Sequence, residues 1–161
     1  MTEIQETMQT LAPVKATVVV EVPKERAFEV FTADMTSWWP ATYKIGPADL
    51  KEAVLERRTG GRWYEIDSDG SQCSWGEVLA YEPYDRLVLN WQVDATWSFN
   101  ETITTEVEVR FVEEAANRTR VELEHRNLER LGDGAPEMRK VFDSDGGWST
   151  ILGLFAQRVA E

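Results

Sequence analysis

Residues 104–113 and 120–127 alternate between apolar and charged side chains. In the first segment Val107, Val109 and Phe111 fall on one side, and charged residues fall on the other. A period of two is typical of a β-strand with one covered face and one wet face. We therefore predict two antiparallel strands that pack on one side against another part of the chain.

Shorter strand-like segments precede these two at regular intervals. They are rich in β-branched and aromatic residues, and turn-forming sequences such as T-G-G and S-D-G-S separate them. Short connections of this kind join antiparallel neighbours rather than crossover units. The predicted strands comprise residues 15–22, 52–57, 62–67, 73–81, 87–93, 104–113 and 120–127.

Helical spacing appears after the first strand and again at the end of the chain. Pro23 suits a first helical position, and Val30 and Phe31 follow in an apolar stripe. A short second helix is predicted over residues 36–39, ended by Pro40. The longest amphipathic pattern comes last and comprises Trp148, Ile151, Leu152, Phe155 and Val159.

These elements define one fold class. Ser144 or Asp145 could cap the last helix. A large sheet with a single late helix must curl around that helix to bury its inner face. We predict an α+β fold in the order strand, two helices, six strands and a long helix. Residues 1–13 are predicted to be a flexible N-terminal segment and residues 14–161 a single domain.

Charge and composition exclude several classes of function. The net charge of −12 repels phosphate backbones and anionic lipid headgroups, so neither nucleic acid nor a membrane is an expected partner. The polar N-terminus lacks the order of a secretion signal, which favours the cytoplasm. Cys73 is the only cysteine and His125 the only histidine, which argues against a disulfide and a zinc site. No cofactor and no metal are therefore expected.

Several stretches, taken in their order and spacing, resemble a known superfamily. They are V-P-K-E-R-A-F-E-V-F-T (22–32), S-W-W-P (37–40), G-G-R-W-Y-E (60–65), W-G-E-V-L-A-Y-E-P-Y-D-R-L-V-L-N-W-Q (75–92), T-R-V-E-L-E-H-R-N-L (119–128) and G-W (147–148). The chain is similar to the START-like or Bet v 1-like (SRPBCC) domains. Within them it most resembles the Activator of Hsp90 ATPase homologue 1-like (AHSA1) family.

The resemblance implies a helix-grip fold, in which a curved antiparallel sheet wraps a long C-terminal helix and encloses a deep cavity. Relatives use such cavities for lipids, polyketides or hormones. The Hsp90 activator itself carries a separate N-terminal domain, for which this chain has no room, so an Hsp90-type chaperone is not an expected partner. A homodimer is left open.

The tryptophans are the main candidates for a ligand site. Trp38 and Trp39 could form a lid over the cavity, or they could close the open end of the sheet as core residues. The same alternatives apply to other indoles on or near the strands, because alternation alone does not say which of them face the cavity. These are Trp63, Trp75, Trp91 and Trp97.

Two titratable residues are candidates for chemistry. His125 falls on the covered face and could donate to a ligand or move a proton, or it could be a satisfied core histidine. Glu65 shares its strand parity with Trp63 and could point inward as a buried carboxylate with a raised pKa. Asp67 has the same parity, so this side could equally be the wet face. Glu77 has the same ambiguity.

Three functional hypotheses remain. The leading one is binding of a small hydrophobic molecule in an internal cavity, with His125 or Glu65 orienting it. The second is a polyketide cyclase or dehydratase that uses these two residues, and no catalytic residue beyond them is predicted. The third is a protein-interaction module in a chaperone or stress-response context. The predicted ligand-binding residues are Trp38, Trp39, Trp63, Trp91, Phe111, Leu123, His125, Trp148, Leu152 and Phe155.

Overall fold

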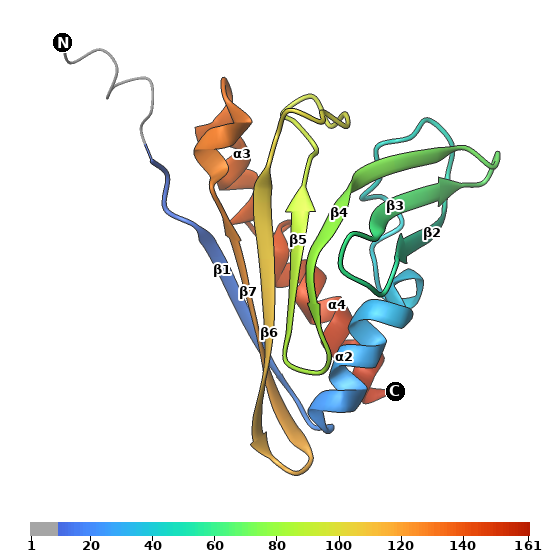
Figure 1. Ribbon diagram of the computed structural model, residues 1–161, viewed down its shortest axis with the longest axis vertical. Coiled ribbons are helices and arrows are strands. Elements are labelled where there is room, and N and C mark those ends of the chain that lie inside the picture. Colours follow the sequence, from blue (N-terminus) through green and yellow to red (C-terminus); the bar gives the residue numbers. More distant parts are fainter. Residues whose placement is uncertain (1–9) are drawn as a thin grey trace.

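The computed structural model describes residues 10–161, so most of the predicted flexible segment lies outside the described residues (Figure 1). The strands are β1 (Val14–Val20), β2 (Leu50–Leu55), β3 (Arg62–Asp67), β4 (Gln72–Glu82), β5 (Arg86–Trp91), β6 (Thr105–Ala115) and β7 (Arg118–Arg126). The helices are α2 (Lys24–Ala33), α3 (Ala135–Phe142) and α4 (Trp148–Ala160), with the 3-10 turns η1 (Met35–Ser37) and η2 (Leu128–Leu131).

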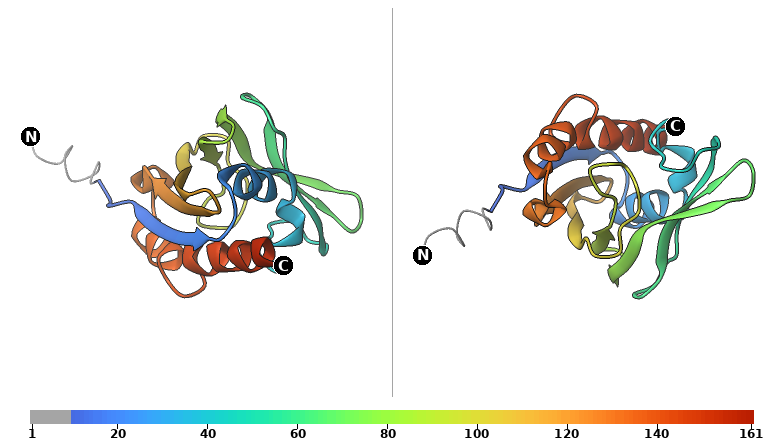
Figure 2. Two further views of the ribbon diagram at one scale, coloured as in Figure 1. Left: turned by 90° about the horizontal axis from the view of Figure 1, so that it is seen from below. Right: turned by 90° about the horizontal axis from the view of Figure 1, so that it is seen from above.

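The seven strands form one antiparallel sheet in the order β1-β7-β6-β5-β4-β3-β2. The sheet curls, and α2 and α4 lie in its concave side (Figure 2). The apolar stripe of α4 is buried there, as the helical spacing predicts. The α+β helix-grip fold predicted from the sequence is confirmed.

Three details differ from the sequence-based expectation. The helix predicted over residues 36–39 is a 3-10 turn that ends at Ser37, before both tryptophans. Helix α4 begins after Gly147, and no side chain caps it, so neither Ser144 nor Asp145 has the predicted role. Helix α3 was not predicted, because its eight residues offer only a short apolar pattern between glycine-rich segments.

One end of the hollow is filled with aromatic side chains. Phe28 and Phe31 of α2 pack edge-on against Phe111 of β6, with ring centroids 5.1 and 5.7 Å apart. Phe31 also contacts Phe155 of α4 at 5.3 Å. These rings close the hollow between helix α2 and the sheet, so any cavity must lie toward the other end of α4.

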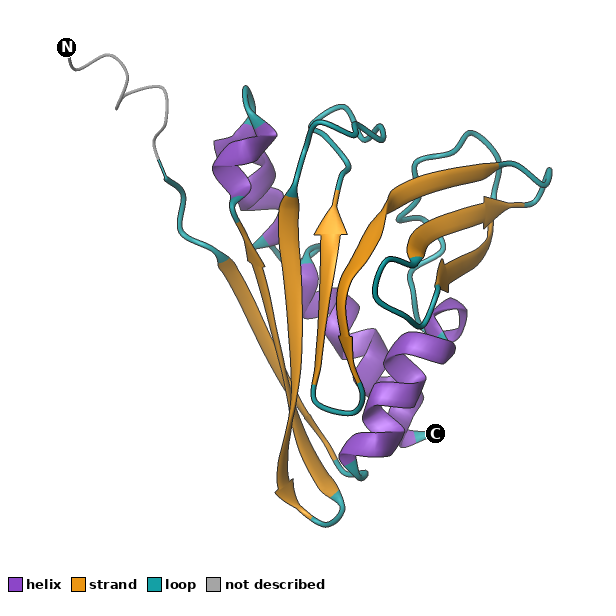
Figure 3. Ribbon diagram, viewed as in Figure 1, coloured by secondary structure: helices purple, strands orange, loops and turns teal. Residues whose placement is uncertain are grey.

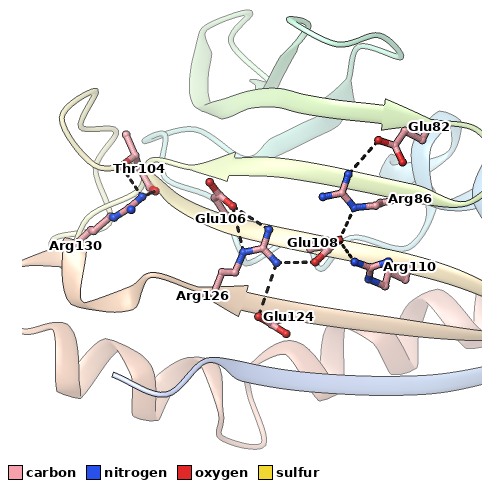
Figure 4. Close-up of polar contacts among 9 residues, drawn as sticks. All are labelled: Glu82, Arg86, Thr104, Glu106, Glu108, Arg110, Glu124, Arg126 and Arg130. Atoms are coloured by element: carbon pink, nitrogen blue, oxygen red, sulfur yellow. Dashed lines mark hydrogen bonds and ion pairs between the residues drawn. The ribbon is translucent and has the colours of Figure 1, made fainter. Parts of the chain in front are cut away.

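The outer face of the sheet carries a network of ion pairs (Figure 4). Glu108 on β6 is almost buried and contacts Arg86 at 2.5 Å, Arg126 at 2.6 Å and Arg110 at 2.9 Å. Burial alone would raise the pKa of Glu108, but these arginines hold it below its usual value. Arg86 also pairs with Glu82 at 3.0 Å, so the network joins the four neighbouring strands β4 to β7.

A β-bulge bends the sheet between β3 and β4. Trp63 pairs with Gly76, whereas Tyr64 pairs with Ser74, so Trp75 is the extra residue on β4. Gly76 has a φ of +156°, and a Cβ there would lie 1.5 Å from the Asn90 carbonyl oxygen on β5. Only glycine allows the two backbones to approach this closely.

Among the described residues, no helix combines the length and apolar character needed to span a bilayer.

We expect Gly76→Ala to lower the free energy of unfolding by about 2–3 kcal/mol, because the new methyl group must push β5 away. Gly153→Ala is the matched control, since nothing lies within 4 Å of its Cβ position on α4. That control should gain about 0.5–1 kcal/mol from helix propensity. Urea denaturation measures both changes, and a Gly76→Ala protein as stable as the parent would contradict the close approach.

Candidate ligand cavity

A cavity of about 500 Å³ opens at the end of the molecule where α3 lies. Three separate connections contribute to its wall: the segment after η1, the loop between β5 and β6, and the junction of α3 with α4 (Figure 3). The hydroxyl of Tyr43 donates to the Gly146 carbonyl at 2.7 Å and joins two of these connections. The lining residues are Trp39, Thr42, Tyr43, Lys44, Ile45, Trp75, Trp91, Val93, Trp97, Val141, Phe142, Gly146, Gly147, Trp148 and Ile151.

Five of the seven tryptophans line this cavity, and two of them bond to nearby backbone. The Trp39 indole N–H donates to the Tyr43 carbonyl at 2.8 Å, and the Trp91 N–H donates to the Val93 carbonyl at 3.0 Å. Each bond fixes its ring through a residue close by in sequence. A satisfied N–H leaves the ring itself as the surface offered to a ligand.

His125 fixes a third indole from behind the wall. Its Nδ1 accepts the Trp148 indole N–H at 3.1 Å, and its Nε2 lies 2.9 Å from the Thr105 hydroxyl. That hydroxyl donates to the Trp91 carbonyl at 2.9 Å. Because Nδ1 accepts and Thr105 already donates its proton elsewhere, the tautomer must be Nε2–H, and both ring nitrogens are engaged.

His125 is fully buried and does not line the cavity. Burial lowers its pKa from 6.5 to about 3, so the imidazole is neutral at physiological pH. The rings packed against it, from Trp91, Phe142 and Trp148, carry no charge. The structure therefore has a satisfied core histidine that positions Trp148.

Glu65 fixes a fourth indole in a similar way. It is fully buried, and its Oε1 accepts the Trp75 indole N–H at 2.8 Å and the Ile45 backbone N–H at 2.8 Å. Its Oε2 accepts the Gly46 N–H at 3.0 Å. The carboxylate thus holds both Trp75 and the backbone of the segment that carries Ile45.

Asp67 lies beside Glu65 and is also fully buried, so this side of β3 is not the wet face, whereas Glu77 is exposed. Burial tends to raise the pKa of Glu65, but hydrogen bonding with Asp67 and the N–H donors keeps it below its usual value. Burial, hydrogen bonding to Glu65 and repulsion from it raise the pKa of Asp67 to about 6. As the pH falls, Asp67 therefore takes up a proton before Glu65 does.

The structure separates the predicted ligand-binding residues into two groups. Three of them line the cavity: Trp39, Trp91 and Trp148. Seven are buried outside its wall: Trp38, Trp63, Phe111, Leu123, His125, Leu152 and Phe155. Of the two alternatives for Trp38, the structure has the core residue and not the lid. Its N–H donates to the Val30 carbonyl, and its ring packs against Phe155.

Sequence reasoning missed the parts of the wall that loops provide. Tyr43, Lys44 and Ile45 follow the S-W-W-P stretch directly, and no periodic pattern marks them. Trp97 is 44% exposed and has a φ of +60°, an unusual conformation for a residue other than glycine. Trp75 and Trp97, whose orientation the sequence left open, both line the cavity.

Comparison with known proteins identifies the family. The family described as Activator of Hsp90 ATPase homolog 1-like protein matches residues 21–160. The chain belongs to this family. None of the curated proteins is similar enough to match.

Solved structures of the same fold include proteins with described roles. An anthrahydroquino-gamma-pyrone synthase, Txn09, is 36% identical over 92% of this chain and 97% of its own, with a TM-score of 0.64. The self-sacrificing resistance protein CalC from Micromonospora echinospora is 29% identical over 92% and 94%, with a TM-score of 0.69. DynU16, from the dynemicin biosynthetic locus, is 20% identical over 93% and 48%, with a TM-score of 0.60, and shows the fold alone. A synthase and a resistance protein on this fold support ligand binding as the general role.

We expect His125 to destabilise the fold on acidification. Its folded-state pKa of about 3 lies below the unfolded value of 6.5, so only the unfolded chain gains a proton in this window. Stability should be full above the unfolded pKa and fall by about 2 kcal/mol between pH 7 and pH 5. His125→Gln keeps one acceptor and one donor but does not titrate.

The quantity to measure is the difference in free energy of unfolding between the parent and His125→Gln at each pH. All other titrating groups, Asp67 included, are common to both proteins and cancel in the difference. A difference that stays constant from neutral pH to pH 5 would show that His125 is not neutral and buried.

Proposed function

We propose that the chain binds a flat, polycyclic aromatic molecule in the tryptophan-lined cavity. The proposal rests on the hydrogen bonds that the indole N–H groups make. In Trp39, Trp75, Trp91 and Trp148 each N–H bonds to the protein, so these residues offer ring surface and no free donor. Such a wall suits an aromatic guest better than a polar one.

The size and rigidity of the cavity support the same proposal. A volume of about 500 Å³ falls within the range of cavities that take small organic ligands. The rings of Trp39 and Trp75 lie 5.0 Å apart at 33°, and each is fixed by its own hydrogen bond. Walls that are ordered before binding lose little conformational entropy when a ligand enters. His125 and Glu65 contribute by positioning indoles rather than by contacting the guest.

A second candidate is ring closure of an open-chain aromatic precursor with loss of water. The observation that favours it is the 36% identity to a pyrone synthase over nearly the whole of both chains. Among the described residues that line the cavity, Tyr43 and Lys44 are the ionisable ones, so either would have to move the proton. An open-chain aromatic polyketide incubated with the protein should then lose the mass of one water. Under the leading proposal the same molecule is recovered with unchanged mass.

The leading proposal is tested with alizarin, a hydroxylated anthraquinone, as the probe. Binding should quench tryptophan fluorescence, and calorimetry gives the affinity. Trp97→Ala removes a lining ring and should weaken binding by about 5- to 20-fold. Phe99→Ala is the matched control, because Phe99 lies in the same loop and is 42% exposed but does not line the cavity.

The control variant should bind as tightly as the parent. Equal weakening by the two substitutions would place the probe on the loop surface rather than in the cavity. An absence of binding to the parent would remove the support for a polycyclic aromatic guest.

A further inference from the structure

Three side chains with metal-binding atoms meet behind the cavity wall. They are Glu65 and Asp67 of β3 and Cys73 of β4, and one donor atom from each lies within 4.8 Å of the others. Glu65 and Cys73 are directly paired across the two strands. Asp67 is two residues further along β3 and therefore faces the same side.

The buried carboxylate of Asp67 lacks groups that would compensate its charge. It is fully buried, and neither Oδ1 nor Oδ2 accepts a hydrogen bond from a donor group of the described residues, since its neighbour Glu65 is itself a carboxyl group. No ion pair in the described part of the chain includes Asp67 or Glu65. The nearby ammonium of Lys44 bonds the Gly46 carbonyl at 2.7 Å. A buried carboxylate without a partner is strongly unfavourable.

A proton shared between the two carboxyl groups would give a partner to only one of the two Asp67 oxygens. One O–H of Asp67 would donate to Glu65, and the other Asp67 oxygen would stay without a partner. A cation placed between the side chains would contact oxygen atoms of both residues and balance their charge. It would also draw on the sulfur of Cys73, which a shared proton leaves unused.

We propose that Glu65, Asp67 and Cys73 form a binding site for a divalent transition metal, for which Zn²⁺ is the best match. A thiolate together with carboxylates suits Zn²⁺, whereas Mg²⁺ and Ca²⁺ prefer oxygen ligands alone. Three protein ligands leave a fourth tetrahedral position for water. Metal–ligand bonds of about 2.0–2.3 Å put such donors about 3.5 Å apart, so the side chains need to move by only about an ångström.

Two local features fit this site. Glu65 Oε2 accepts one hydrogen bond and Oε1 accepts two, so Oε2 retains a lone pair for a metal. Gly46 leaves room for the Asp67 carboxylate, because a Cβ at that position would lie 1.8 Å from Oδ2. Since Oε1 holds the Trp75 indole, metal at this site would stiffen the wall of the cavity from behind.

The site is tested on untagged full-length protein with Zn²⁺ by calorimetry and with Co²⁺ by absorption spectroscopy. We expect one Zn²⁺ per chain at neutral pH. Cys73→Ser and Asp67→Asn should each weaken binding at least about tenfold. Co²⁺ should give a thiolate charge-transfer band in the near ultraviolet, which Cys73→Ser abolishes. Asp67→Asn removes a buried charge and keeps the shape of the side chain, so circular dichroism should show a folded protein.

Asp69→Asn is the matched control, because Asp69 is exposed and bonds Ser71 in the adjoining turn. It should bind Zn²⁺ like the parent. A parent protein that binds no Zn²⁺ overturns the proposal and leaves a shared proton between the carboxyl groups. Binding that survives both Cys73→Ser and Asp67→Asn, with no charge-transfer band, also overturns it and indicates an adventitious surface ion only.

Discussion

A buried indole needs an acceptor for its N–H, and this requirement organises the candidate site. Five tryptophans surround one cavity, and in four of them the N–H donates to an acceptor within the protein. Two of these acceptors are the polar side chains of His125 and Glu65, which the sequence offered as groups for chemistry. Their hydrogen bonds are already used within the protein, so the polar residues shape the wall and the rings form its surface.

The sheet serves two purposes on its two faces. On the outer face, arginines and glutamates of β4 to β7 pair with one another and link the strands. On the inner face, aromatic rings fill one end and leave the other end open. The bulge at Trp75 bends the sheet and turns an additional indole toward the inner face. A regular ladder would alternate these side chains differently and would not gather the rings in one place.

Much of the fold could be predicted because its signals are local. Alternation along residues 104–113 and 120–127 and the stripe of α4 report directly which side of each element is covered. Helix α3 could not be predicted because its apolar pattern is short and glycines flank it. The site was harder to predict from the sequence. Trp63 and Trp91 have similar sequence contexts, yet only Trp91 lines the cavity. Trp63 is covered by the rings of Trp39 and Trp75 and by Met35. These contacts come from segments distant in sequence, and no periodicity reports them.

Three connections that join different pairs of elements contribute to the wall of the cavity. Substitutions in those connections can alter its shape and polarity without disturbing the pairing of any strand. Homologous chains can therefore diverge in guest preference while keeping one framework. Such divergence offers a physical reason why a single architecture appears in both biosynthetic and resistance proteins.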